Sequence, residues 1–313
     1  MKKANTSKTL YIVVPCYNEQ TVLPITSKLF IKKIEDLIKN RKISEESKVL
    51  FVNDGSKDNT WSIIKDLAKK NKHVDGISLS RNRGHQNALL AGLIEAKNLC
   101  DIAVSIDCDG QDDINAIDEM IEKYNDGCEI VYGVRSSRNT DTFFKKFTAE
   151  SFYKLLKAMG VETVFNHADY RLVSSKVLNS FADYKEVNLF LRGIFPLIGY
   201  KSNVVYYERH ERVAGESHYP LSKMLNLAFD GITSLSIKPI TFIIVLSIFV
   251  SVISFIFVVV NAIKHNELWT ATSLICMVLG VIGIFIGIVG EYVGKTYLET
   301  KQRPRYIISE RTY

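Results

Sequence analysis

The sequence predicts an α/β protein with a mainly parallel sheet, followed by two membrane-spanning helices. Through about the first 230 of its 313 residues, short apolar runs typical of strands alternate with helical patterns. Alternation of this kind indicates a parallel sheet covered by helices on both faces. Two later stretches, 237–260 and 270–293, are each long and apolar enough to cross a hydrocarbon core about 30 Å thick.

The predicted elements follow one another as strand, loop and helix. The apolar runs that we assign as strands are 10–14, 49–52, 76–79, 102–106 and 130–132. The helical patterns cover about 20–39, 58–71, 85–98 and 114–125. In such a sheet ligands bind beyond the carboxyl ends of the strands, so the loops at that edge are where chemistry is expected.

The chain is expected to divide into four parts. These are a cytoplasmic domain (1–220), a juxtamembrane amphipathic helix (221–236), two transmembrane helices (237–294) and a basic cytoplasmic tail (295–313). The first apolar run ends at Pro15 and is too short for a signal-peptide core. Five Lys and Arg residues follow the second span, against Lys264 alone in the connector, which predicts that both termini lie in the cytoplasm. We therefore expect a multi-pass protein of the inner (plasma) membrane.

Composition narrows the possible partners. The net charge of +6 suits a protein that lies against anionic lipid. No basic run is interleaved with aromatic residues, so a nucleic-acid partner is not expected. The five cysteines lack CxxC or other metal-ligand spacing, as expected of reduced thiols.

Polar loops follow four of the predicted strands. They read PCYNE (15–19), NDGSKDNT (53–60), SRNRGHQNA (80–88) and DCDGQDD (107–113). Any one of them could be only a turn or a helix cap. The last loop gathers four aspartates, which is costly unless water surrounds them or a divalent cation sits among them. Together the loops would surround one crevice with the groups that a nucleotide diphosphate requires.

These segments resemble the inverting glycosyltransferases of the GT-A fold, family 2, and among them the polyprenyl-phosphate glycosyltransferases. The resemblance covers nearly the whole chain. Its motifs here are VVPCYNE, VNDGSKDNT, LSRNRGHQNALLAG, DCDGQDD, NHADYRL, RVAGESHYPLSKML and GEYVGK. The ordered set is specific, whereas NDGS alone is only moderately so.

The resemblance implies a role for each loop. Asp107, Asp109 and Gln111 would hold Mg²⁺ or Mn²⁺, for which carboxylate oxygens are suitable ligands. Nucleotide binding would fall to Pro15, Tyr17, Glu19, Asp54, Arg81 and Asp107. Asp169, in NHADYRL, matches the residue proposed as the catalytic base, and it joins Asp109 as an expected catalytic residue. Because a polyprenyl phosphate, with a second pKa of about 6, is largely a dianion at pH 7, Asp169 could instead orient a substrate.

A lipid phosphate must also meet cations near the membrane. The expected set is Arg135, Arg138, Lys146 and Arg171. Arg212 lies on a segment that closes over the site in the family, so it is expected to reach the diphosphate, with a solvated hinge as the alternative. Gly283 and Gly287 form a GxxxG motif in the second span, which suits helix packing within the hairpin or between subunits of a homo-oligomer.

The predicted reaction is transfer of one sugar, with inversion, from a nucleotide sugar to undecaprenyl or another polyprenyl phosphate, for use in cell-envelope glycosylation. UDP-glucose is the favoured donor, and UDP-N-acetylglucosamine and GDP-mannose remain alternatives. A processive polysaccharide synthase is disfavoured, because neither Trp61 nor Trp269 lies in a Q-x-x-R-W motif. A non-catalytic membrane adaptor would be expected to lack the carboxylates that this chain retains.

Overall fold

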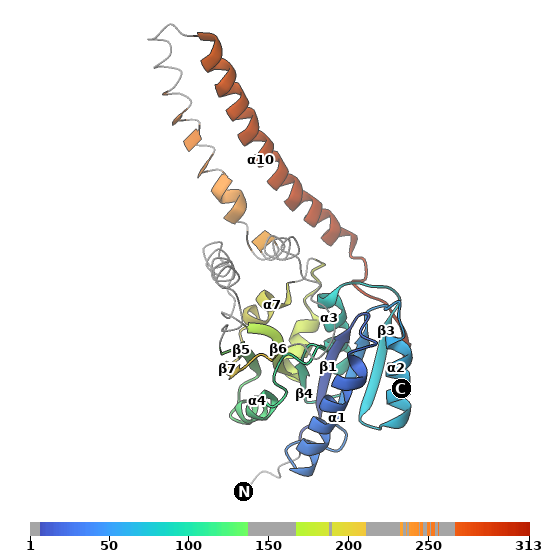
Figure 1. Ribbon diagram of the computed structural model, residues 1–313. Coiled ribbons are helices and arrows are strands. Elements are labelled where there is room, and N and C mark those ends of the chain that lie inside the picture. The colour runs from blue at the N-terminus through green and yellow to red at the C-terminus, as the bar shows by residue number, and fades with distance from the viewer. Residues whose placement is uncertain are drawn as a thin grey trace.

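The fold is that of a computed structural model, which describes residues 7–136, 167–187, 190–210 and 267–313 and scattered positions between 232 and 256 (Figure 1). The described residues form one sheet with the strand order β7-β5-β6-β4-β1-β2-β3-β8. The strands are β1 (Leu10–Cys16), β2 (Lys48–Asn53), β3 (Val74–Leu79), β4 (Ile102–Ser105), β5 (Ile130–Arg135), β6 (His167–Ser174), β7 (Ser202–Tyr207) and β8 (Ile308–Arg311).

Helices connect most of these strands. They are α1 (Leu23–Lys39), α2 (Thr60–Lys70), α3 (His85–Ala96), α4 (Ala116–Asn125), α6 (Ser175–Ala182), α7 (Leu191–Leu197) and α10 (Glu267–Lys301). The α/β class and the mainly parallel sheet are confirmed: β1 pairs in parallel with β2 and β4, and β2 with β3. The sequence did not predict β6, which runs antiparallel between β4 and β5.

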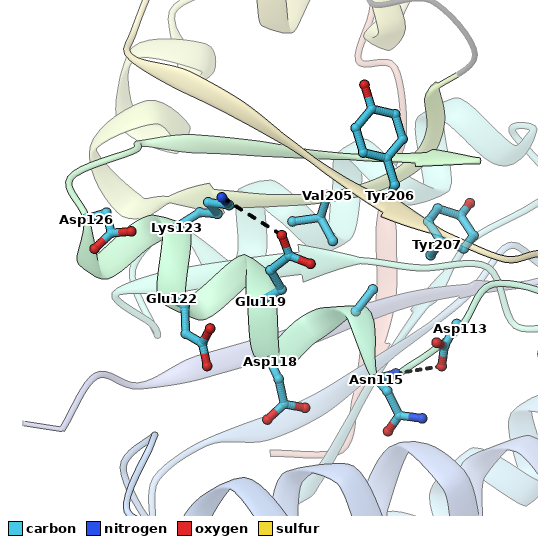
Figure 2. Close-up of a pocket in the computed structure, with 11 residues that line it drawn as sticks. Asp113, Asn115, Asp118, Glu119, Glu122, Lys123, Asp126, Val205, Tyr206 and Tyr207 are labelled. Atoms are coloured by element: carbon cyan, nitrogen blue, oxygen red, sulfur yellow. Dashed lines mark hydrogen bonds and ion pairs between the residues drawn. The ribbon is translucent and has the colours of Figure 1, made fainter. Parts of the chain in front are cut away.

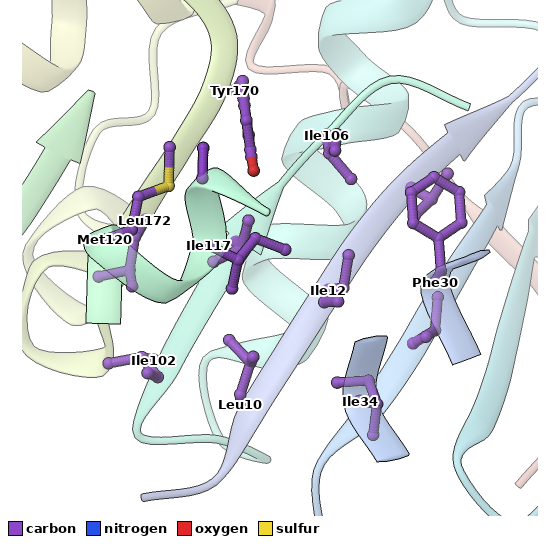
Figure 3. Close-up of a cluster of buried hydrophobic side chains, with 14 of the residues drawn as sticks. Leu10, Ile12, Phe30, Ile34, Ile102, Ile106, Ile117, Met120, Tyr170 and Leu172 are labelled. Atoms are coloured by element: carbon purple, nitrogen blue, oxygen red, sulfur yellow. The ribbon is translucent and has the colours of Figure 1, made fainter. Parts of the chain in front are cut away.

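The alternating side chains of β1 divide the core between the two faces of the sheet. Leu10, Ile12 and Val14 pack with α1, α2 and α4 on one face (Figure 3). Tyr11 and Val13 pack with α3, α6 and α7 on the other. Apolar residues on both sides of a strand are what a parallel sheet buried on both faces requires. The loops at the sheet edge therefore rest on a rigid three-layer support.

Helix α3 packs closely on the sheet at Gly92. A Cβ atom added there would lie 2.4 Å from Val13 Cγ1 and 2.7 Å from Val52 Cγ2. These distances are too short for a methyl group, so the absence of a side chain allows the contact. This packing fixes the start of α3, which carries the SRNRGHQNA loop, relative to β1 and β2.

Helix α10 projects away from the sheet (Figure 1). Its stretch Val278–Lys301, of 24 residues, is long and apolar enough to cross a membrane by length and composition. The helix continues beyond Val293, where the second span was predicted to end. In the predicted first span (237–260), 13 of the 24 positions are described, and all of these are helical; most of the predicted amphipathic helix (221–236) lies outside the described residues. The two-span hairpin and homo-oligomerisation therefore stay predictions.

The chain returns from α10 to the sheet. Residues 308–311 pair antiparallel with β3 as β8, and Arg311 binds the Glu95 carboxylate on α3 at 2.7 and 3.1 Å. We expected 295–313 to be a basic cytoplasmic tail. In the structure, the helix extends to Lys301 and the last residues form an edge of the same sheet as the predicted nucleotide loops.

Gly92→Ala should destabilise the protein by about 1–3 kcal/mol, because the added methyl group overpacks the contact with Val13 and Val52. Helix propensity alone predicts the opposite sign, a gain of about 1 kcal/mol. Thermal unfolding of the detergent-solubilised protein distinguishes the two: a higher midpoint for Gly92→Ala would contradict the packing described here.

Candidate functional site

The acidic loop after β4 forms one side of the site. Asp107 keeps about a third of its side chain exposed, whereas Asp109 is only 8% exposed. The backbone turns at Gly110 with a φ of +69°, which glycine adopts without strain. The amide of Gln111 then donates to Asp109 Oδ1 at 3.1 Å. The two aspartates are thus held at the carboxyl end of a buried strand, as predicted.

Asp112 ties this loop to β5 and β7. Its Oδ1 accepts a hydrogen bond from the Tyr207 hydroxyl at 2.6 Å and lies 3.8 Å from the Arg135 guanidinium. Burial, together with the negative charge of Asp107, raises the pKa of Asp112 to about 6. Arg135, predicted to bind the acceptor phosphate, therefore lies against the acidic loop.

The residues that follow β7, 208–210, also contact the acidic loop. His210 N donates to the Gln111 carbonyl at 2.8 Å, and the Arg209 guanidinium donates to the Gln111 side-chain oxygen. The side-chain oxygen that we predicted as a metal ligand is therefore hydrogen-bonded to Arg209. Arg212 follows two residues later and lies outside the described residues, as do Arg138 and Lys146.

Asp169, on β6, is surrounded by cations. Arg171 Nη2 donates to its Oδ1 at 2.7 Å, and the Arg192 guanidinium binds both oxygens at 3.3 and 3.0 Å. Burial would raise the pKa of Asp169, but Arg192, His85 and Arg171 outweigh it and hold the pKa well below its usual range. Asp169 is thus a stable anion and a weak proton acceptor, which favours the orienting role over the base.

Arg171 is fully buried. Besides Asp169, its guanidinium donates to the Leu191 carbonyl at 3.2 Å and lies 4.7 Å from the centre of the Phe195 ring. No part of the residue reaches solvent, so this position does not agree with the predicted contact to a lipid phosphate. Arg171 instead fixes the Asp169 carboxylate from inside the domain.

His85 and Arg192 are site residues that the sequence analysis missed. The His85 Nε2 atom lies 3.5 Å from Asp107 and 3.6 Å from Asp169, so one imidazole connects the acidic loop with β6. Burial lowers the pKa of His85, but the two carboxylates raise it to about 9. The position of His85 in the polar loop SRNRGHQNA could have indicated it. Arg192 lies in no motif that we identified, and only the fold brings it here.

The predicted nucleotide loops lie beside one another at the same edge. Asp54 is 2% exposed and accepts from the amides of Arg83 and Gly84 at 2.7 and 2.9 Å. Burial raises the pKa of Asp54 despite these two hydrogen bonds. In this structure Asp54 therefore ties the second loop to the third.

The other predicted nucleotide residues divide by exposure. Tyr17 and Arg81 are exposed, Glu19 is half-buried, and Pro15 is buried within β1 beside Val52. Tyr17 is thus free to pack on a base, while Pro15 shapes the strand end from inside the sheet.

A hollow of about 580 Å³ lies elsewhere, on the surface between α4 and β7 (Figure 2). Five of its eleven lining residues are acidic, and none is a residue that we predicted for donor or metal. Asp113, at its edge, accepts from the Asn115 amide at 2.9 Å. We therefore do not assign this hollow to the donor.

The acidic loop fits a divalent cation that is shared with a diphosphate. No group of three or more His, Cys, Asp or Glu side chains gathers into a metal site within the described part of the chain. Mg²⁺ commonly takes only one or two carboxylates and completes its shell with phosphates and water. Asp107 and Asp109 would supply such a pair of hard oxygen ligands.

Comparison with known proteins agrees with this geometry. Residues 11–181 match glycosyl transferase family 2. The chain belongs to this family. It is 48% identical to YkoT, an uncharacterised glycosyltransferase of Bacillus subtilis, over 96% of this chain and 90% of that protein. It is 39% identical both to the prophage bactoprenol glucosyl transferase homologue of Escherichia coli K12 and to the bactoprenol glucosyl transferase of Shigella phage SfX, over at least 95% of each chain.

Family membership makes the protein a glycosyltransferase with the GT-A type of sheet. It confirms the family that the sequence motifs indicated. The match covers all the strands from β1 to β6 and therefore both Asp107 and Asp169.

Arg192→Ala should lower sugar transfer by roughly tenfold or more at pH 7, because Asp169 loses a two-point contact. Removing this charge also raises the pKa of Asp169 toward its ordinary value, so the deficit should deepen as the pH is lowered toward that pKa and Asp169 becomes protonated. Arg192→Lys, which keeps the charge, serves as the control. A ratio of variant to wild-type kcat/KM that stays constant with pH would contradict this account.

Proposed function

We propose that this glycosyltransferase transfers one sugar, with inversion, from a nucleotide sugar to polyprenyl phosphate at the cytoplasmic face of the membrane. The observation that carries the proposal is the position of His85, whose imidazole contacts both Asp107 and Asp169. A donor diphosphate at the acidic loop would then place its sugar beside Asp169. The two relatives named bactoprenol glucosyl transferase, which the chain matches over nearly its whole length, support a prenyl acceptor and a glucosyl donor.

Asp107 and Asp109 would hold Mg²⁺ or Mn²⁺, and the bound ion would offset the charge that develops on the departing nucleoside diphosphate. Tyr17 and Arg81, exposed at the same edge, would contact the base and ribose, with Glu19 as a hydrogen-bond acceptor. Asp54 would support this pocket by holding the 81–84 loop.

The charge around Asp169 suggests how the acceptor is oriented. A carboxylate repels a phosphate dianion, so we assign Asp169 to hydroxyl groups of the donor sugar. Arg171 and Arg192 both bind the Asp169 carboxylate. Of these two guanidinium groups, Arg171 is buried, whereas Arg192 has 29% of its side chain exposed and is placed to meet an incoming phosphate.

The acceptor then needs no base from the protein. A polyprenyl phosphate with a second pKa of about 6 is largely a dianion at neutral pH. Its oxygen attacks the anomeric carbon of the sugar as the bond to the nucleoside diphosphate breaks on the opposite side. The low pKa of Asp169 agrees with this scheme, because the carboxylate stays charged throughout.

Helix α10 would hold the reaction at the bilayer surface. A long prenyl chain stays in the hydrocarbon core, so the site must lie at the level of the headgroups. Among the described residues, Val278–Lys301 supplies one candidate span. The first predicted span and the cytoplasmic location of both termini belong to the same proposal.

The purified protein in nanodiscs should convert a radiolabelled nucleotide sugar into a lipid that requires polyprenyl phosphate for its formation. A panel of UDP-glucose, UDP-N-acetylglucosamine and GDP-mannose, scored by organic-phase label and by thermal shift, identifies the donor, because bound donor stabilises the folded state. Label that appears instead in a polymer, or binding without any transfer, would contradict the proposal and favour a synthase or an adaptor, respectively.

Chelation by EDTA should abolish transfer, and Mg²⁺ or Mn²⁺ should restore it. Asp109→Asn should lower kcat by at least about a hundredfold while the unfolding midpoint changes little, because the ion loses a charged ligand. The control is Asp113→Asn in the same loop, whose side chain caps Asn115, and it should retain most of the activity. Full activity in chelator would exclude the metal assignment.

A further inference from the structure

The C-terminal end of α10 and the residues just after it form hydrogen bonds with the segment 184–187, which lies between α6 and α7. Both carboxylate oxygens of Glu299 accept from the amide of Val187 at 2.8 Å. Shortly after the helix, the Arg305 guanidinium donates to the carbonyls of Glu186 and Tyr184 at 2.9 and 2.8 Å. These partners are more than 110 residues apart in the sequence, so the contacts exist only in the folded protein.

The bonded segment, 184–187, ends shortly before α7, which begins at Leu191 and carries Arg192. The α7 helix is also held from the other side, where its first amide, on Leu191, donates to the Gln86 side chain of α3 at 2.9 Å. The Leu191 carbonyl in turn accepts from Arg171. The position of Arg192 thus depends on α3, on β6 and on the segment that α10 holds.

Arg192 connects this arrangement with Asp169. Its guanidinium binds Asp169 through two donors, a geometry that small displacements disrupt. The planar guanidinium of Arg305 binds the carbonyls of Tyr184 and Glu186, and Glu299 accepts from the next amide, on Val187. A shift of the base of α10 would therefore be transmitted to α7 and to the two-point contact.

We infer that Glu299 and Arg305 are positioning residues for the Asp169–Arg192 pair, so that the base of the candidate membrane helix sets the geometry of the transfer site. The inference rests on the proposed function, because it assigns Asp169 and Arg192 to the reacting substrates. It gives α10 a role beyond anchoring: the helix orders a segment of the catalytic domain.

The test compares variants of the full-length protein in nanodiscs. Glu299→Ala and Arg305→Ala should each lower kcat by roughly 5- to 20-fold, because each removes charge-assisted hydrogen bonds to the segment. The Kd for the nucleotide donor and the KM for the acceptor should change by less than about twofold, since neither residue lies at the donor loops. Glu299→Gln and Arg305→Lys, which keep an acceptor and a donor, should recover most of kcat.

A matched control separates positioning from loss of the C-terminal anchor. Glu310→Ala, in β8, removes the acceptor of the Trp61 indole but touches nothing in 184–192, so its kcat should equal that of wild type. In an Arg192→Ala background, Glu299→Ala should have little further effect on kcat, because its influence passes through Arg192. Equal losses in Glu310→Ala and Glu299→Ala, or independent effects of Glu299→Ala and Arg192→Ala, would overturn the inference.

Hydrogen exchange provides a readout that does not depend on turnover. Peptides covering 184–192 should exchange faster in Glu299→Ala than in wild type, while peptides covering β8 should not change. If the wild type transfers no sugar to polyprenyl phosphate, the proposed function fails and exchange still tests the link. Unchanged exchange at 184–192 in Glu299→Ala would overturn the link, whatever the activity.

Discussion

The burial of the Asp169 carboxylate constrains much of the surrounding structure. An unpaired carboxylate at this depth would cost several kcal/mol, so the fold must bring cations to it. It does so from separate elements: Arg171 from β6, Arg192 from α7 and His85 from α3. Each of these elements has to be fixed in turn, which explains why the Leu191 carbonyl, the Gln86 side chain and the tight contact at Gly92 all lie close behind the site.

The acidic loop differs from Asp169, because several carboxylates gather there and Asp107 remains partly exposed. Its aspartates repel one another, and the raised pKa of Asp112 records that cost together with the cost of burial. The loop keeps Asp107 partly accessible, while Asp112 accepts a hydrogen bond from Tyr207 and lies near the Arg135 guanidinium. One carboxylate is thus stabilised by fixed cations inside the domain, while the neighbouring pair retains a negative charge that suits a divalent ion. The two environments thus differ in how their negative charge is compensated.

The C-terminal part of the chain connects this site with α10. A helix that only anchored the protein would need no contact with the catalytic domain beyond its connection in the chain. Here the chain after α10 enters the sheet as β8, and Glu299 and Arg305 bind the backbone ahead of α7. The boundary expected at residue 220 therefore separates two parts of the sequence, although the sheet draws its strands from both.

The sequence by itself determined the elements with strong local signals. Strands β1 to β5 and their helices were predictable because β-branched runs and amphipathic patterns act over a few residues. Asp107, Asp109 and Asp169 were identified from motifs. The tertiary structure decided which side chains meet them. His85, Arg192 and Glu299 reach their partners across 22 to 112 residues, Arg171 turned out to be buried, and β8 pairs with a strand more than 200 residues earlier. Such contacts depend on the three-dimensional path of the chain, which no local pattern encodes.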